Sequence, residues 1–208
     1  MRLVDDSVKG FAEALGSDAP VPGGGCAAAL QGALGASLAR MVAALTAGRA
    51  KYAEHSDFVA ELLAALERLQ GEFINAIDED KLAFDEFSLA LALPKETPQE
   101  KAARKLAMGA ALKSCARAPM RVMELALEAL ELVERAVGKT NANAASDLGV
   151  AALSLKASIQ GSWLNVLTNL GGTGDETFND DFRQKGRAIM ERALPAADRA
   201  YEAILKSL

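Results

Sequence analysis

Runs of β-branched residues are nearly absent from this sequence, whereas Ala, Leu, Glu and Lys are abundant. β-Branched side chains favour pleated strands, and unbranched side chains lose little rotamer freedom in a helix. The sequence therefore predicts an all-α fold without a sheet. Helices are expected over residues 3–16, 24–47, 56–92, 98–137, 143–170 and 178–206.

Two prolines fall inside these predicted helices. Pro119 and Pro195 each remove a backbone N–H and crowd the preceding turn, so we expect them to break or kink the fourth and sixth helices. The chain shows no repeat with a period of about 20–50 residues and no long linker. Its 208 residues therefore predict a single helical domain over residues 1–208.

The inventory of charges and metal ligands excludes several functions. Lys and Arg number 23 against 28 Asp and Glu, a net charge of -5. No basic stripe is present to neutralise phosphates, so no nucleic-acid partner is expected. One histidine and two cysteines are too few for a structural zinc site of the usual kind, so no metal site is expected either.

The expected location is the cytoplasm. The N-terminal residues carry charges where a secretory signal would have an apolar run. No stretch of about 18 apolar residues without a charge is present, and the most apolar one, residues 26–39, is too short, so no membrane-spanning helix is expected. In this compartment Cys26 and Cys115, which lie far apart in the sequence, are predicted to be free thiols.

The predicted helix 24–47 is built from unusually small side chains. Ala and Gly recur on all of its faces, at positions 28, 32, 35, 36, 39 and 43. Each Gly lowers intrinsic helix stability by about 1 kcal/mol relative to Ala, so tertiary packing must compensate. We therefore expect a central helix with close neighbours on several sides, and a subunit interface is one candidate for such packing.

Asp80 interrupts the apolar stripe of the predicted helix 56–92. The stripe has the alternating spacing of a packed helix and comprises Val59, Leu63, Leu66, Phe73, Ile77, Phe84, Phe87 and Leu91. Two interpretations of Asp80 remain open. In the first, its carboxylate is buried or lines a cleft and is suited to acid–base catalysis. In the second, it is a solvated residue at a helix end or at a local twist of the stripe. The neighbouring Asp78, Glu79 and Lys81 are interpreted as a solvated face.

A stripe of small and polar side chains follows the predicted helix 143–170. Its members are Asp147, Ala151, Ser154, Ser158, Gly161, Asn165 and Asn169. Asp147 is either an N-terminal charge or cap of this helix, or a functional carboxylate. Asn165 and Asn169 either bond to other helices or offer amide donors and acceptors to a planar heterocycle.

The loop Pro22–Gly25 precedes the helix of small residues. Three consecutive glycines expose backbone N–H groups at a helix N-terminus, an arrangement that suits an anion. The loop lacks the lysine and the preceding strand of a P-loop. A plain turn and a loop that contacts a substrate both remain open.

Several of these segments resemble one family, the formiminotetrahydrofolate cyclodeaminases and methenyltetrahydrofolate cyclohydrolases. The family pattern P-G-G-G-S-A-A-A-L is similar to Pro22–Leu30, with Cys26 in place of the serine. The family's D-x-D-x-x-A-F, L-P-K-x-T-P-x-E-K and N-V-x-x-N-L match residues 78–84, 93–101 and 165–170. Shorter matches lie at residues 33–36, 48–52 and 141–152, so the resemblance covers nearly the whole chain in order.

The resemblance implies a fold and a function. The implied fold is an all-helical, two-layer up-and-down bundle that forms a homodimer, here in the stand-alone form without a transferase domain. The implied substrate is a folate, with or without a polyglutamate tail. Cyclodeamination of 5-formimino-tetrahydrofolate to 5,10-methenyl-tetrahydrofolate and ammonia is the first expectation, and cyclohydrolysis of the methenyl compound to 10-formyl-tetrahydrofolate is the alternative. A catalytically silent helical dimer that binds a partner is the non-enzyme alternative.

The resemblance also implies roles for residues. The reacting amidinium or methenyl cation requires carboxylates, which makes Asp80 and Asp147 the expected catalytic residues, with no cofactor besides the folate. Asn165 and Asn169 would contact the pterin ring. The glutamate tail would take Arg49 or Lys51, with Lys95, Lys101 and Arg104 as further candidates. The expected substrate-binding residues are Pro22, Gly23, Gly24, Gly25, Cys26, Arg49, Lys51, Asn141, Asn165 and Asn169.

Overall fold

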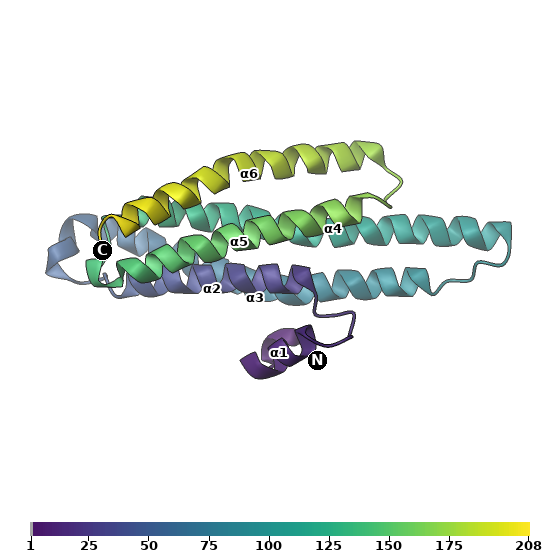
Figure 1. The fold of residues 1–208 in the computed structure, drawn as a ribbon, viewed down its shortest axis with the longest axis horizontal. Coiled ribbons are helices and arrows are strands. Elements are labelled where there is room, and N and C mark those ends of the chain that lie inside the picture. The colour runs from purple at the N-terminus through teal and green to yellow at the C-terminus, as the bar shows by residue number, and fades with distance from the viewer. Residues whose placement is uncertain (1) are drawn as a thin grey trace.

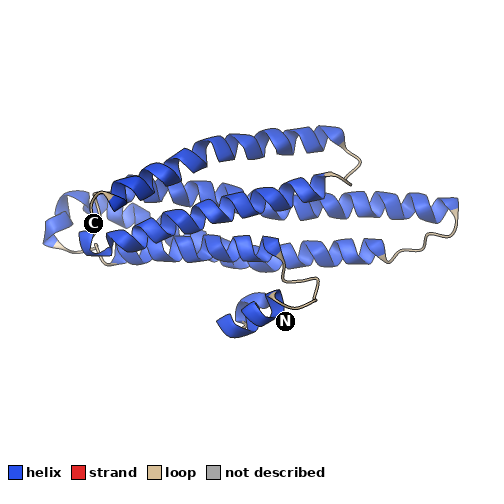
Figure 2. Cartoon of the chain, viewed as in Figure 1, coloured by secondary structure: helices blue, strands red, loops and turns tan. Residues whose placement is uncertain are grey.

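The computed structural model describes residues 2–208, and every regular element in that range is helical (Figure 2). The α-helices are α1 (Val8–Leu15), α2 (Gly24–Ala44), α3 (Ser56–Leu91), α4 (Pro98–Ala136), α5 (Ala145–Leu170) and α6 (Glu176–Leu205). Short 3-10 helices lie between them as η1 (Leu3–Asp5), η2 (Ala50–His55) and η3 (Ala142–Ala144). The all-α prediction is confirmed, and the five long helices lie close to their predicted ranges.

Helices α2 to α5 run alternately up and down and form a bundle (Figure 1). α2 packs against α3 and α5, and α4 packs against the same two helices, so two antiparallel pairs enclose the core. α6 packs against α4 and α5 and adds a helix on that side. The core contains the fully buried side chains Leu66, Phe73, Met123, Leu155 and Ile159.

The small residues of α2 allow its neighbours to approach closely. A Cβ atom on Gly32 would lie 2.3 Å from Phe73 Cε1, and one on Gly35 would lie 2.8 Å from Leu155 Cγ. The predicted central helix is therefore confirmed, with α3 on one side and α5 on the other. α2 is long and apolar enough to span a membrane by length and composition alone, at a mean hydropathy of 1.3, but 56% of that window is buried inside the bundle.

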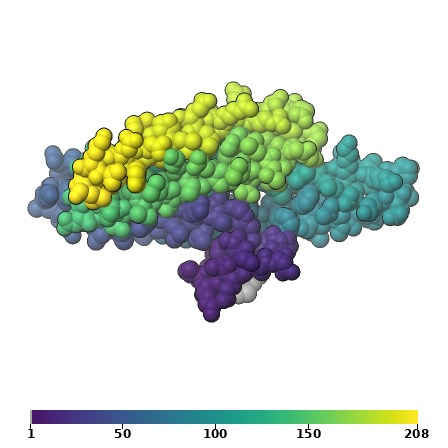
Figure 3. Space-filling model, viewed as in Figure 1, coloured from purple at the N-terminus to yellow at the C-terminus, as the bar shows by residue number. Residues whose placement is uncertain are grey.

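The N-terminal segment departs from the predicted helix 3–16. η1 ends at Asp5, Asp6 is extended, and Ser7 caps the separate helix α1 by accepting a hydrogen bond from the Gly10 N–H at 3.0 Å. A side-chain cap of this kind competes with continuation of the preceding helix. No residue of α1 is fully buried, and the helix lies on one side of the bundle, where Phe11 is partly buried against the core (Figures 1 and 3).

Neither internal proline ends its helix. α4 runs through Pro119 and α6 runs through Pro195, so a break at either position is wrong, and the alternative of a kink stays a prediction. Both helices pack against neighbours along their length, and this packing offsets the intrinsic cost of the prolines.

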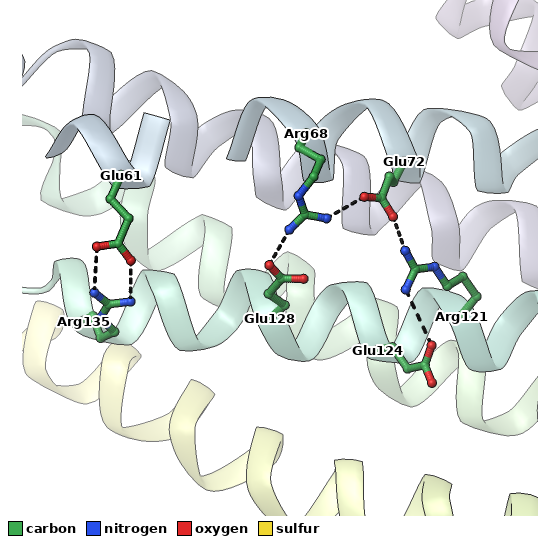
Figure 4. Close-up of polar contacts among 7 residues, drawn as sticks. All are labelled: Glu61, Arg68, Glu72, Arg121, Glu124, Glu128 and Arg135. Atoms are coloured by element: carbon green, nitrogen blue, oxygen red, sulfur yellow. Dashed lines mark hydrogen bonds and ion pairs between the residues drawn. The ribbon is translucent and has the colours of Figure 1, made fainter. Parts of the chain in front are cut away.

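Ion pairs cover the outer side of α3 and α4, as Figure 4 shows. The pairs drawn there are Glu61–Arg135, Arg68–Glu72, Arg68–Glu128, Arg121–Glu72 and Arg121–Glu124. Further pairs join α4 to α6, among them Glu131–Arg192 and Glu134–Arg199. Exposed pairs contribute about 0–1 kcal/mol each. These pairs therefore add little to the stability of the fold, but they show that these sides of the helices face solvent.

The C-terminal part of α3 and the N-terminal part of α4 project beyond the other helices (Figures 1 and 3). We call residues 82–112 the α3–α4 projection. Thr97 caps its second helix in a capping box with Glu100, and Pro98 occupies the first helical position. Leu89 and Leu106 in the projection are 73% and 77% exposed, so the hairpin carries apolar surface that its own chain leaves uncovered.

Candidate active site

Asp80 lies within α3 at the level where α2 begins. A Cβ atom on Gly25 would sit 2.1 Å from Asp80 Oδ1, so only glycine permits the carboxylate to reach this position. The Cys26 thiol donates a hydrogen bond of 3.2 Å to Asp80 Oδ2. The carboxylate is thus seated against the first turn of α2, where the positive end of the helix dipole favours an anion.

Asp80 is mostly buried with part of its side chain open to solvent. Burial raises the pKa of its carboxyl above the ordinary value, while hydrogen bonds from the thiol and the backbone N–H of Cys26 oppose that rise. The alternative of a helix end is wrong, because α3 continues to Leu91. The predicted buried carboxylate with a partner is the arrangement observed.

The asparagine pair of α5 lies beside this carboxylate. A Cβ atom on Gly24 would meet Asn165 Nδ2 at 3.3 Å, which places Asn165 at the first turn of α2. Asn165 Nδ2 donates to the Gly161 carbonyl, and Asn169 Nδ2 donates to the Asn165 carbonyl, both at 2.9 Å. Among residues 2–208 neither side-chain Oδ1 accepts a hydrogen bond, so each retains an acceptor.

Asn169 also crosses to α4. Its Nδ2 donates a hydrogen bond of 2.9 Å to the carbonyl of Cys115. That carbonyl would pair with the N–H of residue 119 in an uninterrupted helix, but Pro119 has none. Of the two asparagines, Asn169 therefore bonds to another helix, through one of its amide hydrogens.

Cys115 completes the immediate surroundings. Its thiol donates to the Ala83 carbonyl at 3.2 Å, and burial raises its pKa to about 11, with Asp80 adding to the effect. Burial raises the pKa of Cys26 to about 12. Both thiols are free and keep their protons at neutral pH, so they act as hydrogen-bond donors beside Asp80. Glycines 24 and 25, Cys26, Asp80, Asn165, Asn169 and Cys115 are called the Asp80 cluster below.

A second group of predicted residues gathers at the opposite end of the bundle. The backbone N–H of Asn141 donates to Thr46 Oγ1 at 2.8 Å, and Ala142 N–H donates to the Tyr52 hydroxyl at 3.0 Å. A cavity of about 280 Å³ is lined there by Thr46, Arg49 and Tyr52, among others. Lys51 Nζ lies 5.5 Å from the centre of the Tyr52 ring.

Asp147 belongs to this second end. It is partly exposed in the first turn of α5, and Ala144 is the N-cap residue, so Asp147 is an N-terminal charge and not a cap. Along α5 it lies about 27 Å from Asn165, at 1.5 Å per residue. Asn141, Arg49, Lys51 and Asp147 are called the Asp147 end below. Within one chain these residues and the Asp80 cluster do not meet.

The remaining tail candidates lie in the α3–α4 projection. Lys95 and Lys101 are exposed. Arg104 donates from Nε to the Leu91 carbonyl at 3.1 Å, which ties the start of α4 to the end of α3. At the loop, Pro22 is buried and Gly23 forms the N-cap of α2 without a side-chain bond.

Sequence reasoning missed three contributors to this region. Asp78 is not part of a solvated face: its carboxylate accepts from Leu3 N–H at 2.7 Å and pairs with Arg2 at 2.8 Å, which anchors the N-terminal segment beside Asp80. Cys115 and Pro119 were not recognised as members of the site. The one available signal was their spacing of four residues, because a proline leaves the carbonyl four positions earlier free.

The Asp80 cluster combines one mostly buried carboxyl with two thiols and the amide groups of two asparagines. In the part of the chain that the structure describes, no three His, Cys, Asp or Glu side chains gather in a metal-binding arrangement. A carboxyl with opposing effects on its pKa can accept and return a proton as its surroundings change. Its negative charge also stabilises a cation, more strongly where water is partly excluded.

The chain is similar in sequence and fold to known proteins. The family model described as formiminotransferase-cyclodeaminase matches residues 7–188. The chain is 36% identical over 200 residues to a methenyltetrahydrofolate cyclohydrolase of Methylorubrum extorquens, covering 96% of each. It is 30% identical over 191 residues to the formimidoyltransferase-cyclodeaminase of Mus musculus, covering 92% of this chain and 35% of that protein.

A solved structure shares the whole fold. The crystal structure of formiminotetrahydrofolate cyclodeaminase from Thermotoga maritima superposes with a TM-score of 0.82 at 27% identity, covering 98% of this chain and 96% of that one. Sequence and fold thus agree over nearly the full length, and the chain belongs to the formiminotransferase-cyclodeaminase family.

Proposed function

We propose that this chain is a folate one-carbon enzyme that acts at the bridging carbon of a tetrahydrofolate derivative. Cyclohydrolysis of 5,10-methenyl-tetrahydrofolate to 10-formyl-tetrahydrofolate is the first candidate. The observation that supports it is the 36% identity to a cyclohydrolase over 96% of both chains. The sequence alone favoured cyclodeamination, which becomes the second candidate.

The Asp80 cluster suits the chemistry of cyclohydrolysis. Water adds its oxygen to the methenyl carbon and loses a proton, which leaves a hydroxyl group on that carbon. The bond from the carbon to N5 then breaks as N5 gains a proton, while the hydroxyl group loses its own proton to solvent and becomes the formyl C=O. Asp80 accepts the first proton and supplies the second, a role that general acid–base groups fill at about 10²–10⁴-fold in rate. The methenyl group carries a positive charge, which the Asp80 carboxylate stabilises before the proton moves.

Cyclodeamination would use the same carboxyl in the same order, with different atoms losing and gaining the proton. N10 loses a proton as it closes on the formimino carbon, and the departing nitrogen gains a proton to leave as ammonia. The likeness to the Thermotoga maritima structure, described as a formiminotetrahydrofolate cyclodeaminase, favours this second candidate. One carboxyl can serve both proton transfers, so the reaction needs no cofactor besides the folate and no metal.

An absorbance assay of the methenyl chromophore separates the two reactions. Decay faster than in enzyme-free buffer indicates cyclohydrolysis, and growth from 5-formimino-tetrahydrofolate with release of ammonia indicates cyclodeamination. The matched control is Asp80→Asn, which keeps the shape of the side chain. Folate binding without either spectral change would contradict the enzyme proposal and support the silent binding module.

We further propose that the chain works as a homodimer through the outer face of α2 and α5. This face carries exposed apolar side chains, namely Leu34, Met41, Leu45, Val150, Leu153 and Leu164. The two cations of these helices are turned aside, because Arg40 pairs with Glu67 of α3 and Lys156 pairs with Asp198 of α6. The outer sides of α3, α4 and α6 carry ion pairs, whereas the α2–α5 face is apolar. This difference favours contact of the α2–α5 face with a second copy of the chain.

A two-fold axis across this face would also complete the site. If the two-fold axis of this isologous dimer runs perpendicular to the helices, each helix lies antiparallel to its copy, so the two ends of the face exchange places. The Asp80 cluster of one protomer then lies near the Asp147 end of its partner. Such a pairing brings together the predicted residues that one chain keeps about 27 Å apart. The folate, including any polyglutamate tail, would bind between the protomers in the cytoplasm.

A further inference from the structure

The side chain of Cys26 lies in an unusual position for a thiol. It is fully buried at the first turn of α2, with Sγ 3.2 Å from Asp80 Oδ2 and 3.5 Å from the Ile77 carbonyl. A thiol has one proton and donates to one acceptor at a time, and the Asp80 contact is the shorter. Because Cys26 has no exposed surface, its side chain does not contact a substrate directly, and Asp80 is the one titratable group that its thiol contacts among residues 2–208.

The protonation state of Cys26 defines what it can do. Burial raises its pKa to about 12, so the sulfur keeps its proton at neutral pH. A protonated thiol is a poor nucleophile and a weak hydrogen-bond donor. It therefore favours the ionised form of Asp80, to a smaller extent than a hydroxyl would at the same position.

We propose that Cys26 is a positioning residue whose thiol holds the Asp80 carboxylate and sets the pH range in which Asp80 exchanges its proton. This inference rests on the proposed function of Asp80. Gly25 supplies the space for the carboxylate, and Cys26 supplies the donor, so two consecutive residues of α2 hold one side chain of α3.

The other groups around Asp80 stay constant when only residue 26 changes. From α4, the Cys115 thiol faces this region and donates to the Ala83 carbonyl. On α3, Lys81 pairs with Asp85 at 2.5 Å, and Glu79 is exposed. From the N-terminal segment, Arg2 pairs with Asp78. None of these pairs includes Cys26.

Two substitutions give opposite expectations. Cys26→Ser replaces the weak donor with a stronger one, and Cys26→Ala removes it. The pH limb of kcat/KM that reports Asp80 ionisation should therefore move to lower pH in the serine variant and to higher pH in the alanine variant. On the acid side of that limb, kcat/KM of Cys26→Ala should fall by about two- to tenfold, as expected for one lost hydrogen bond.

A direct titration makes the inference independent of turnover. The carbon-13 resonance of the Asp80 carboxyl, assigned by its loss in Asp80→Asn, is followed against pH in the three forms at position 26. Ala27→Ser is the matched control, because it adds a hydroxyl in the same turn at a residue that lines the cavity beside α1.

The outcomes are distinct. Opposite shifts of the Asp80 titration in Cys26→Ser and Cys26→Ala, with none in Ala27→Ser, support the role of Cys26 even if both folate assays fail. Shifts of the same sign, or no shift in folded variants with unchanged melting temperatures, would overturn it. If the titration shifts but the pH profile of turnover does not, Asp80 is not the proton-exchanging group, and the inference fails together with that part of the proposed function.

Discussion

The side-chain amide of Asn169 donates a hydrogen bond to the backbone carbonyl of Cys115, at a distance of 2.9 Å. Pro119 leaves that carbonyl without a helical N–H partner, so a proline in α4 orients an asparagine of α5. The contact holds Asn169 within the Asp80 cluster with its Oδ1 still available as an acceptor.

Pro119→Ala tests this relationship. Alanine restores an N–H that competes with Asn169 for the Cys115 carbonyl, and it also removes an unfavourable residue from a helix interior. We therefore expect an unchanged or higher melting temperature together with a KM for the folate about two- to tenfold higher, the range for one hydrogen bond. An unchanged KM in a stable variant would show that the orientation of Asn169 has no bearing on substrate binding.

Asp80→Asn should abolish most turnover while it preserves the fold. The amide keeps the shape of the carboxyl and can still accept from Cys26, but it cannot exchange a proton. We expect kcat to fall by about 10²–10⁴-fold with little change in folate affinity. The measurement is the methenyl absorbance assay, with binding followed separately by calorimetry. Near-normal turnover would transfer the catalytic role to Asp147.

The same substitution should affect stability in a pH-dependent way. Burial raises the folded-state pKa of Asp80 above its unfolded value. The stability linked to this group is therefore fully present below the unfolded pKa, about 3.9, and is lost as the pH rises through the folded pKa. Asp80→Asn should melt at a higher temperature than the natural chain at neutral pH, and the difference should shrink on acidification. Thermal unfolding at several pH values measures it, and a lower melting temperature at neutral pH would contradict the assigned direction.

Gly24→Ala and Gly25→Ala form a matched pair one residue apart. A Cβ atom at position 25 would overlap Asp80 at 2.1 Å, whereas one at position 24 would approach the Asn165 amide at 3.3 Å. We expect Gly25→Ala to destabilise the fold by about 1–3 kcal/mol and to displace Asp80, with loss of turnover. Gly24→Ala should fold normally and weaken folate binding through Asn165. If Gly24→Ala and Gly25→Ala reduced the stability of the fold equally, the loop would be a plain turn with no specific role in the site.

Mixing two inactive variants tests the shared site of the proposed dimer. Asp80→Asn and Asp147→Asn, unfolded and refolded together in equal amounts, should form mixed dimers in which one of the two sites is intact. Random pairing predicts about a quarter of the natural activity. Each variant refolded alone is the control. Recovery no greater than in the controls would argue against a site shared between protomers.

The oligomeric state has its own test. Light scattering across a wide concentration range should give a dimer mass, and Leu34→Glu with Leu164→Glu should reduce it to that of a monomer by placing charges on the α2–α5 face. A monomer mass for the natural chain at all concentrations would refute the dimer.

Local sequence patterns determined most of the helical architecture. The scarcity of β-branched runs predicted the all-α fold, and the predicted helix 98–137 lies close to α4, because helix propensities act over a few residues. The alternating spacing of the α3 stripe identified Asp80 as anomalous, since helical geometry alone decides which side chains share a face.

Only the tertiary structure decided what those anomalies contact. The spacing within α3 gives no sign that α2 begins opposite Asp80, so the roles of Gly25 and Cys26 as its neighbours appear only once the helices pack. For the same reason the sequence did not reveal that Asp78 pairs with Arg2. Nor did it reveal that Asp147 lies at the opposite end of the bundle from Asp80. Periodicity orders residues along one helix, whereas contacts between distant helices depend on where each helix starts, ends and crosses its neighbours.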